Sequence, residues 1–159
     1  MTEHAIRCFL LAHQGPKDEA SQIEDHLAEL AELARSCDME PMGRRLLKRP
    51  AVDSRSYYGR GQVEAVADEA RRMGAEFLVC DDELSGSQVH NIEKVTGLHC
   101  LDRTGLILAI FEQRAKTREA RAQVELARCE YQLPRLKGAW AHLERQVGGV
   151  EGREVGGGA

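Results

Sequence analysis

Three short segments carry residues whose types and spacing suit the binding of a phosphate or a metal ion. The turn Tyr57-Tyr58-Gly59-Arg60-Gly61-Gln62 places two glycines directly before a predicted helix, where backbone N–H groups and the helix dipole attract anions. The run Asp81-Asp82-Glu83 follows a strand-like apolar run, and carboxylates are ligands that Mg²⁺ prefers. The residues considered for nucleotide binding are Gly59, Arg60, Gly61, Gln62, Asp81, Asp82, Asp102, Arg103 and Thr104.

Each segment also has a purely structural interpretation, and the sequence leaves both open. A glycine pair of this kind more often forms a tight turn at a helix start, and acids after a strand are more often solvated. Asp102 or Thr104 is placed to cap the helix that follows, with Arg103 free to pair with a carboxylate. Weak binding of ATP with magnesium is therefore one hypothesis, and no catalytic residue is assigned.

The elements that would position these segments alternate between strands and helices. Short apolar runs lie between segments that have one apolar helical face. This alternation predicts an α/β fold with a small parallel four-stranded sheet flanked by helices, in which ligands collect beyond the carboxyl ends of the strands. Ser21 with Glu24 and Ser85 with Gln88 are possible capping boxes. The predicted strands are 5–12, 44–48, 77–80 and 98–101, and the predicted helices are 18–35, 62–73 and 85–95.

One long C-terminal helix is expected to follow the sheet, as half of a helical hairpin. The predicted divisions are an α/β subdomain at 1–102, the helix at 103–147 and a glycine-rich flexible tail at 148–159. A coiled-coil seam needs a facing helix, which would be a second copy, a full-length relative or a second hairpin helix, and we favour pairing with a second copy. The seam consists of Ala122, Leu126, Cys129, Leu133, Leu136, Trp140, Leu143 and Val147.

Charge is distributed unevenly along the chain. Residues 1–102 contain 12 Lys and Arg against 19 Asp and Glu, whereas residues 103–147 contain 9 against 5. A phosphate-rich partner should therefore meet the long helix, although such a basic run is often only a solvated face. The candidate RNA-binding residues are Arg114, Arg118, Arg121, Arg128, Arg135, Lys137, Arg145, Gly148 and Gly149.

Several classes of function lack their sequence signatures here. The sequence contains no G-x-x-x-x-G-K-[ST] phosphate loop, no G-x-S-x-G and no H-E-x-x-H. The five cysteines form no close C-x-x-C pair, which favours reduced core thiols over disulfides or zinc. Without a charged leader or a long apolar run, the chain is expected to be cytoplasmic, with no membrane partner and no metal site.

Several motifs resemble those of HflX-type ribosome-associated GTPases. They are Tyr57-Tyr58-Gly59-Arg60-Gly61-Gln62-Val63-Glu64, Asp81-Asp82-Glu83-Leu84-Ser85, Asn91-Ile92-Glu93-Lys94, Asp102-Arg103-Thr104-Gly105-Leu106-Ile107-Leu108, Gln123-Val124-Glu125-Leu126-Ala127 and Leu133-Pro134-Arg135-Leu136. The resemblance covers the family's N-terminal domain, from about residue 5 to residue 149. It implies binding to the large ribosomal subunit, with ribosome splitting or rescue by the full-length protein. An ATP-binding activity of the N-terminal region is also implied.

The sequence departs from the family pattern in two places. Gln62 stands where the family usually has lysine, which weakens a phosphate-binding role for the turn. The second hairpin helix and the G domain have no counterpart in these 159 residues. GTP with magnesium would belong to that G domain, so GTP hydrolysis is not expected of this chain, and no cofactor is assigned to it.

Overall fold

The computed structural model describes residues 5–133 and contains one sheet, with the strand order β2-β1-β3-β4 and every neighbouring pair parallel. The predicted four-stranded parallel α/β sheet is confirmed. Strand β2 starts earlier than the predicted 44–48, because β1 pairs with it from Ile6 opposite Met39 onward. Pro41 and Gly43 interrupt the strand pattern there. The strands are β1 (Ile6–Gln14), β2 (Met39–Lys48), β3 (Phe77–Cys80) and β4 (His99–Asp102).

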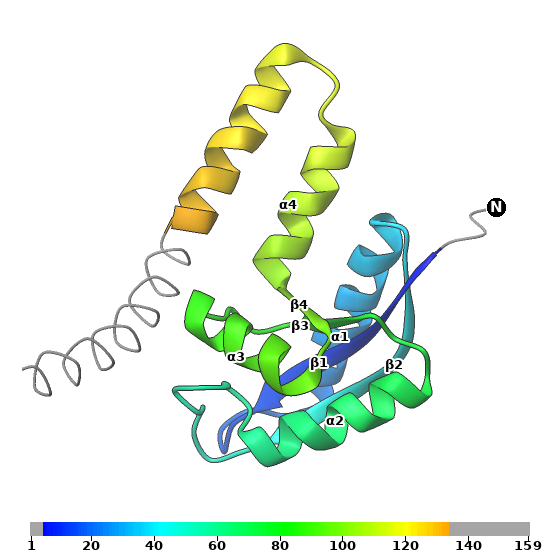
Figure 1. Ribbon diagram of the computed structural model, residues 1–159, viewed down its shortest axis with the longest axis vertical. Coiled ribbons are helices and arrows are strands. Elements are labelled where there is room, and N and C mark those ends of the chain that lie inside the picture. The colour runs from blue at the N-terminus through cyan, green and yellow to red at the C-terminus, as the bar shows by residue number, and fades with distance from the viewer. Residues whose placement is uncertain (1–4, 134–159) are drawn as a thin grey trace, which may run out of the picture.

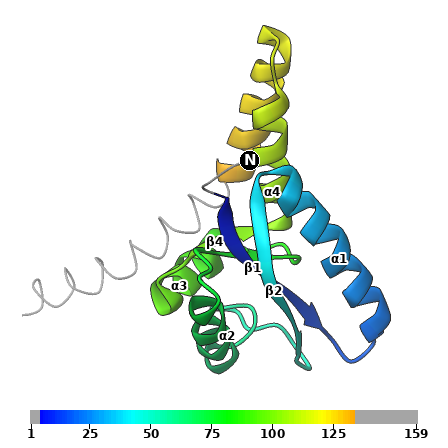
Figure 2. The same cartoon turned by 90° about the vertical axis from the view of Figure 1, so that its right-hand side faces the viewer.

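Helices cover both faces of the sheet (Figures 1 and 2). Alternate residues of β1 point to opposite faces, so Leu10 packs against α1 and α4 while Phe9 and Leu11 pack against α2 and α3. All three side chains are buried, which explains why β1 appears in the sequence as a continuous apolar run. The helices are α1 (Ala20–Ser36), α2 (Arg60–Arg72), α3 (Gly86–Thr96) and α4 (Arg103–Arg114).

One predicted capping box is present and the other is wrong. The Ser85 hydroxyl accepts from the Gln88 backbone N–H, and the Gln88 side chain accepts from the Ser85 backbone N–H, so this box starts α3. Helix α1 instead begins at Ala20, with Glu19 as its N-cap and no side-chain cap. Ser21 therefore lies inside the first turn, where its side chain does not cap the helix.

The long helix expected from residue 103 is interrupted at 115–117, which corrects the prediction of one continuous helix over 103–147. Ala115 has an extended conformation (φ −73°, ψ 107°) and ends α4. The Thr117 hydroxyl accepts from the Ala120 backbone N–H at 3.0 Å and starts a new helix over 118–133. A helical hairpin results, in which the 118–133 helix returns alongside α4 (Figure 1).

The predicted coiled-coil seam does not face α4. Val124, Arg128 and Tyr131 line the groove beside α4, whereas Leu126 and Leu133 are 61% and 56% exposed. Ala122 and Cys129 are also exposed, so the described half of the seam is open to solvent. The rest of the seam lies outside the described residues: Leu136, Trp140, Leu143 and Val147.

All five cysteines are free thiols, and Cys8, Cys37, Cys80 and Cys100 are buried as predicted. Burial raises the pKa of the Cys8 thiol to about 12, so this thiol stays protonated at neutral pH. Cys129 is the exception, because it belongs to the exposed seam. Within residues 5–133, no helix has the length and apolar character that crossing a membrane requires.

Candidate functional site

The crevice at the carboxyl ends of β1 and β3, where the strand order changes direction, is filled by side chains of the protein itself. Asp82 accepts hydrogen bonds from the His13 backbone N–H at 2.9 Å and from the Tyr58 hydroxyl at 3.0 Å. Tyr58 is fully buried. Burial raises the pKa of Asp82, although the bonds from His13 and Tyr58 oppose the rise. Ligands of such sheets lie in this crevice, and here the tyrosine and the carboxylate occupy it.

The loop before α2 carries Tyr58 into this crevice. The Asp53 carboxylate accepts from the backbone N–H groups of Ser56 at 2.7 Å and Arg55 at 3.0 Å, and the bond from Ser56 chiefly lowers the pKa of Asp53. Tyr57 has a φ of 66°, which side chains other than glycine rarely adopt. A loop that holds a strained residue in this way is fixed by its hydrogen bonds.

The glycine turn at the start of α2 is only partly open. Arg49 lies in front of Gly59, so close that a methyl group there would meet its guanidinium at 1.8 Å. Arg49 also donates to the Tyr58 carbonyl at 3.3 Å. Arg60 pairs with Glu64 at 2.9 Å, and the Gln62 amide donates to the Lys48 carbonyl at 3.4 Å. Of the two glycines in this turn, only Gly61 has free space around it, and the binding of a phosphate here stays a prediction.

The carboxylates that follow β3 and β4 bind other groups of the protein. Asp81 forms an ion pair with Arg103, which also pairs with Glu29 at 3.0 Å. Asp102 is fully buried and caps α4 by accepting from the Gly105 backbone N–H at 2.9 Å, as the capping interpretation predicted. Thr104 is half-buried in the first turn of α4. No cluster of metal-ligating side chains is found among residues 5–133.

Asp102 also attaches the hairpin to the sheet. Its second oxygen accepts from the Leu84 backbone N–H at 3.1 Å, and the Tyr131 hydroxyl of the 118–133 helix donates to the first. A methyl group at Gly105 would lie 2.9 Å from the Tyr131 hydroxyl and 2.8 Å from Leu101 Cδ1. The contacts of Tyr131 with Gly105 and Asp102 could not be predicted from local spacing, because they join residues far apart in the chain.

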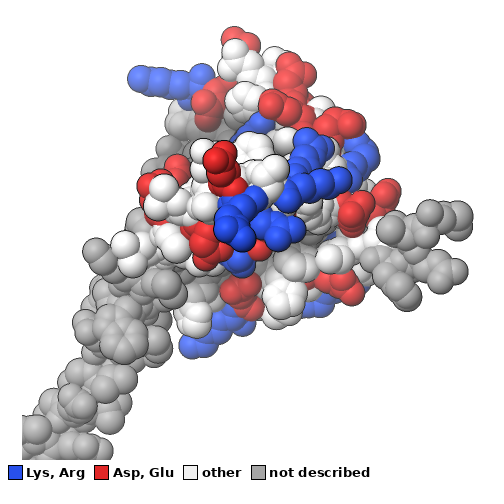
Figure 3. Space-filling view, turned by 90° about the horizontal axis from the view of Figure 1, so that it is seen from above, with Lys and Arg blue, Asp and Glu red and all other residues white. Residues whose placement is uncertain are grey.

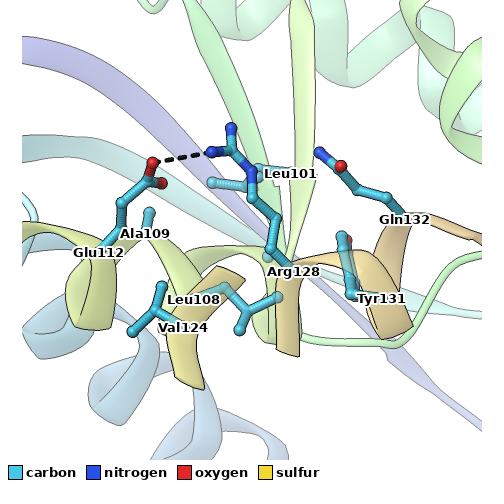
Figure 4. Close-up of a pocket in the computed structure, with 9 residues that line it drawn as sticks. Leu101, Leu108, Ala109, Glu112, Val124, Arg128, Tyr131 and Gln132 are labelled. Atoms are coloured by element: carbon cyan, nitrogen blue, oxygen red, sulfur yellow. Dashed lines mark hydrogen bonds and ion pairs between the residues drawn. The ribbon is translucent and has the colours of Figure 1, made fainter. Parts of the chain in front are cut away.

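A groove of about 200 Å³ lies between the two hairpin helices (Figure 4). Its floor is apolar, with Leu101, Leu108 and Val124 among the lining residues. Arg128 reaches across it to Glu112, and the two side chains form an ion pair at 2.8 Å. Arg128 is therefore already neutralised, unlike the other described RNA-binding candidates.

The end of the hairpin gathers four cationic side chains around its turn: Arg114, Lys116, Arg118 and Arg121. None of them pairs with a carboxylate of residues 5–133, and Glu119 is the one acid in this stretch. Arg121 donates to the Ala115 carbonyl at 3.4 Å, which places it against the end of α4. Lys116 was not among the residues chosen from the sequence, although it lies in the same basic run. The remaining candidates lie outside the described residues: Arg135, Lys137, Arg145, Gly148 and Gly149.

Comparison with known proteins agrees with this architecture. The family profile described as GTP-binding GTPase N-terminal matches residues 24–112, and the profile for the GTP-binding GTPase Middle Region matches residues 114–159. The GTPase HflX of Spirochaeta thermophila is 38% identical over 150 residues, which cover 94% of this chain and 36% of the relative. The GTPase HflX of Flavobacterium psychrophilum is 43% identical over 129 residues, which cover 81% and 31%.

The chain belongs to the HflX-type GTPase family. It corresponds to the N-terminal part and spans about a third of the length of these relatives. Solved structures show the same fold: a GTP-binding protein from Sulfolobus solfataricus in complex with GDP has a TM-score of 0.65 at 19% identity, covering 93% of this chain and 44% of its own. The SsGBP and GDP complex has a TM-score of 0.66 at 21% identity and covers 84% and 37%.

Proposed function

We propose that this HflX-type chain is a ribosome-binding module, which associates with RNA of the large ribosomal subunit through the cationic end of its helical hairpin. In the full-length family such binding would serve ribosome splitting or rescue, and a partner of this kind would place the chain in the cytoplasm. GTP hydrolysis is not part of the proposal, because the sequence has no G-x-x-x-x-G-K-[ST] motif.

The observation that carries the proposal is the unpaired charge at the hairpin end. Seen from that end, Lys and Arg side chains lie near the middle of the face, with Asp and Glu side chains beside them (Figure 3). Arginine presents a planar fork of donors that matches phosphate oxygens, and the three arginines here are not engaged by acids of residues 5–133. RNA backbone is the ribosomal partner that supplies phosphates in a regular array.

Charge reversal tests this proposal directly. Replacing Arg114, Arg118 and Arg121 by Glu should weaken cosedimentation with purified large subunits and flatten its salt dependence, because each lost phosphate contact lowers the salt slope by about one unit at most. The matched control replaces Lys17, Arg55 and Lys94, three exposed cations of the sheet region, by Glu. If both variants cosediment like the parent at every salt concentration, the hairpin end is only a solvated surface.

The remaining candidates can be tested in the same assay. Reversing the charge of Arg135, Lys137 and Arg145 would show whether the contact extends beyond the described residues, as the sequence predicts.

Titration with GTP is a separate test. A chain without a phosphate loop should give no heat of binding in isothermal titration with GTP. Stoichiometric binding of GTP at micromolar concentration would contradict the assignment of GTP binding to the G domain alone.

A further inference from the structure

An exposed aromatic side chain lies next to the cationic end of the hairpin. Phe111 is 53% exposed in the last turn of α4, and its carbonyl accepts from the Ala115 backbone N–H that ends this helix. Arg114 follows three residues later, on the same side of the helix. The neighbouring acid Glu112 is already paired with Arg128. The structure therefore combines an open aromatic ring with cations that have no carboxylate partner within residues 5–133.

We propose that this end is a binding site for unpaired RNA, in which Phe111 stacks on a base while Arg114, Lys116, Arg118 and Arg121 contact the phosphates. Aromatic rings next to cationic side chains are the usual means by which proteins hold single-stranded nucleic acid. Bases inside a duplex offer no open face for such stacking, so single strands, loops and bulges are the expected targets.

The composition of the hairpin end favours RNA over other polyanionic partners. In the stretch 111–121, Phe111 is the only large apolar residue, and one such side chain provides too little apolar surface for stable insertion into a membrane. An acidic protein would satisfy the cations but would leave the ring of Phe111 without a matching planar group. A nucleotide provides both a phosphate and a base.

The inference refines the proposed function by naming the form of RNA that the hairpin end takes. Its test uses free RNA instead of ribosomal subunits, so the two can fail separately. A chain that binds the oligonucleotide but does not cosediment with large subunits would contradict the proposed ribosome binding. Subunit binding that does not depend on Phe111 would contradict base stacking at this site and would leave the proposed function in place.

The experiment compares three fluorescein-labelled RNAs of equal length by anisotropy with the full chain: an oligouridylate, the same strand with abasic riboses, and a duplex. We expect the parent to bind the oligouridylate about tenfold more tightly than the abasic strand. Phe111→Leu should bind the two strands equally and keep the parent's salt slope, because leucine preserves the apolar contact area but has no ring. Replacing the four cations by Gln should lower the salt slope by about three units.

Two results would overturn the inference. Equal affinity of the parent for the oligouridylate and the abasic strand would exclude stacking, and tighter binding of the duplex would exclude a preference for unpaired RNA. A salt slope unchanged by the four Gln substitutions would exclude the phosphate contacts. Far-ultraviolet circular dichroism and urea unfolding of each variant show that it is folded. Phe111 and the cations are exposed, so these variants should unfold at the same urea concentration as the parent.

Discussion

The sheet region and the hairpin of this protein differ in how far their charged side chains form ion pairs. Around the sheet, most arginines pair with a carboxylate of the same chain, as Arg45 does with Glu69 at 2.7 Å. At the hairpin end, four cations have no acid partner within residues 5–133. Arginines that pair this way in the sheet region are at positions 35, 44, 45, 49, 60, 71 and 103.

The same contrast holds for polar groups at the carboxyl edge of the sheet. Asp82 and Asp102 each accept several hydrogen bonds from the protein, so the edge that commonly binds ligands is used here to hold loops and the hairpin. Tyr131 connects the two regions through Asp102. Polar and charged residue types therefore indicate a binding surface only where the protein does not already pair them with its own groups.

The junction between the regions should be the most sensitive point. We expect Asp102→Ala to lower the free energy of unfolding by about 3 kcal/mol, because two backbone N–H groups and the Tyr131 hydroxyl lose their acceptor. Urea unfolding measures this loss. Asp25→Ala, an exposed position on α1, is the matched control and should change little. Equal effects of the two substitutions would contradict the role of Asp102.

A methyl group at the junction should have the next largest effect. Gly105→Ala is expected to destabilise the chain by about 2 kcal/mol, because the added carbon would approach Leu101 and Tyr131 within 3 Å. Gly61→Ala is the control: it lies in the first turn of α2 with open space around it and should be neutral or slightly stabilising. Thermal unfolding followed by circular dichroism separates the two, and a neutral Gly105→Ala would show that the junction is loosely packed.

One arginine substitution in each region tests this difference in ion pairing. Arg103→Gln should cost about 1 kcal/mol of unfolding free energy, since Glu29 loses its partner and Asp81, which is only 12% exposed, is left with His26 at 3.8 Å. Arg114→Gln should cost nothing measurable. Chemical unfolding at low and high salt provides the comparison. A larger cost for Arg114→Gln would mean that the hairpin end is paired after all.

The buried carboxylate of the sheet region should give a pH dependence of definite sign. Burial raises the pKa of Asp82, so its contribution to stability is fully present below the unfolded value of about 3.9 and is lost as pH rises through the raised value. The stability of the parent relative to Asp82→Asn should therefore fall with rising pH over that window. Urea unfolding of both proteins at a series of pH values tests this. If the parent became more stable relative to Asp82→Asn as the pH rises, the pKa of Asp82 would be lowered and not raised.

The exposed seam should show the smallest effect on folding. Leu126→Glu with Leu133→Glu is expected to change the unfolding free energy by less than about 0.5 kcal/mol, because both side chains face solvent. The pair should nevertheless reduce self-association, which we expect the parent to show through this seam. Light scattering at high concentration measures the mass. A monomeric parent would contradict pairing with a second copy, and Val124→Glu, inside the hairpin groove, is the control that should disturb folding.

The regular elements of this protein could be predicted from its sequence alone. Alternating apolar strands and amphipathic helices fixed the parallel sheet, since strands such as 77–80 can bury both faces only between layers of helices. Local chemistry also identified the capping box of Ser85 and Gln88 and the cap by Asp102, because these contacts join residues three apart. The family motifs lie in the same segments.

Which polar residues remain available to a binding partner depends on long-range packing. The turn at 115–117 divides the predicted helix, because Thr117 begins a new one and Tyr131 can then return to Asp102, 29 residues earlier in the chain. The same folding engages Asp82 with Tyr58 and pairs Arg103 with Asp81, yet gives the cations of the hairpin end no acid partner among the described residues. Contacts between residues far apart follow from packing, which local spacing does not encode.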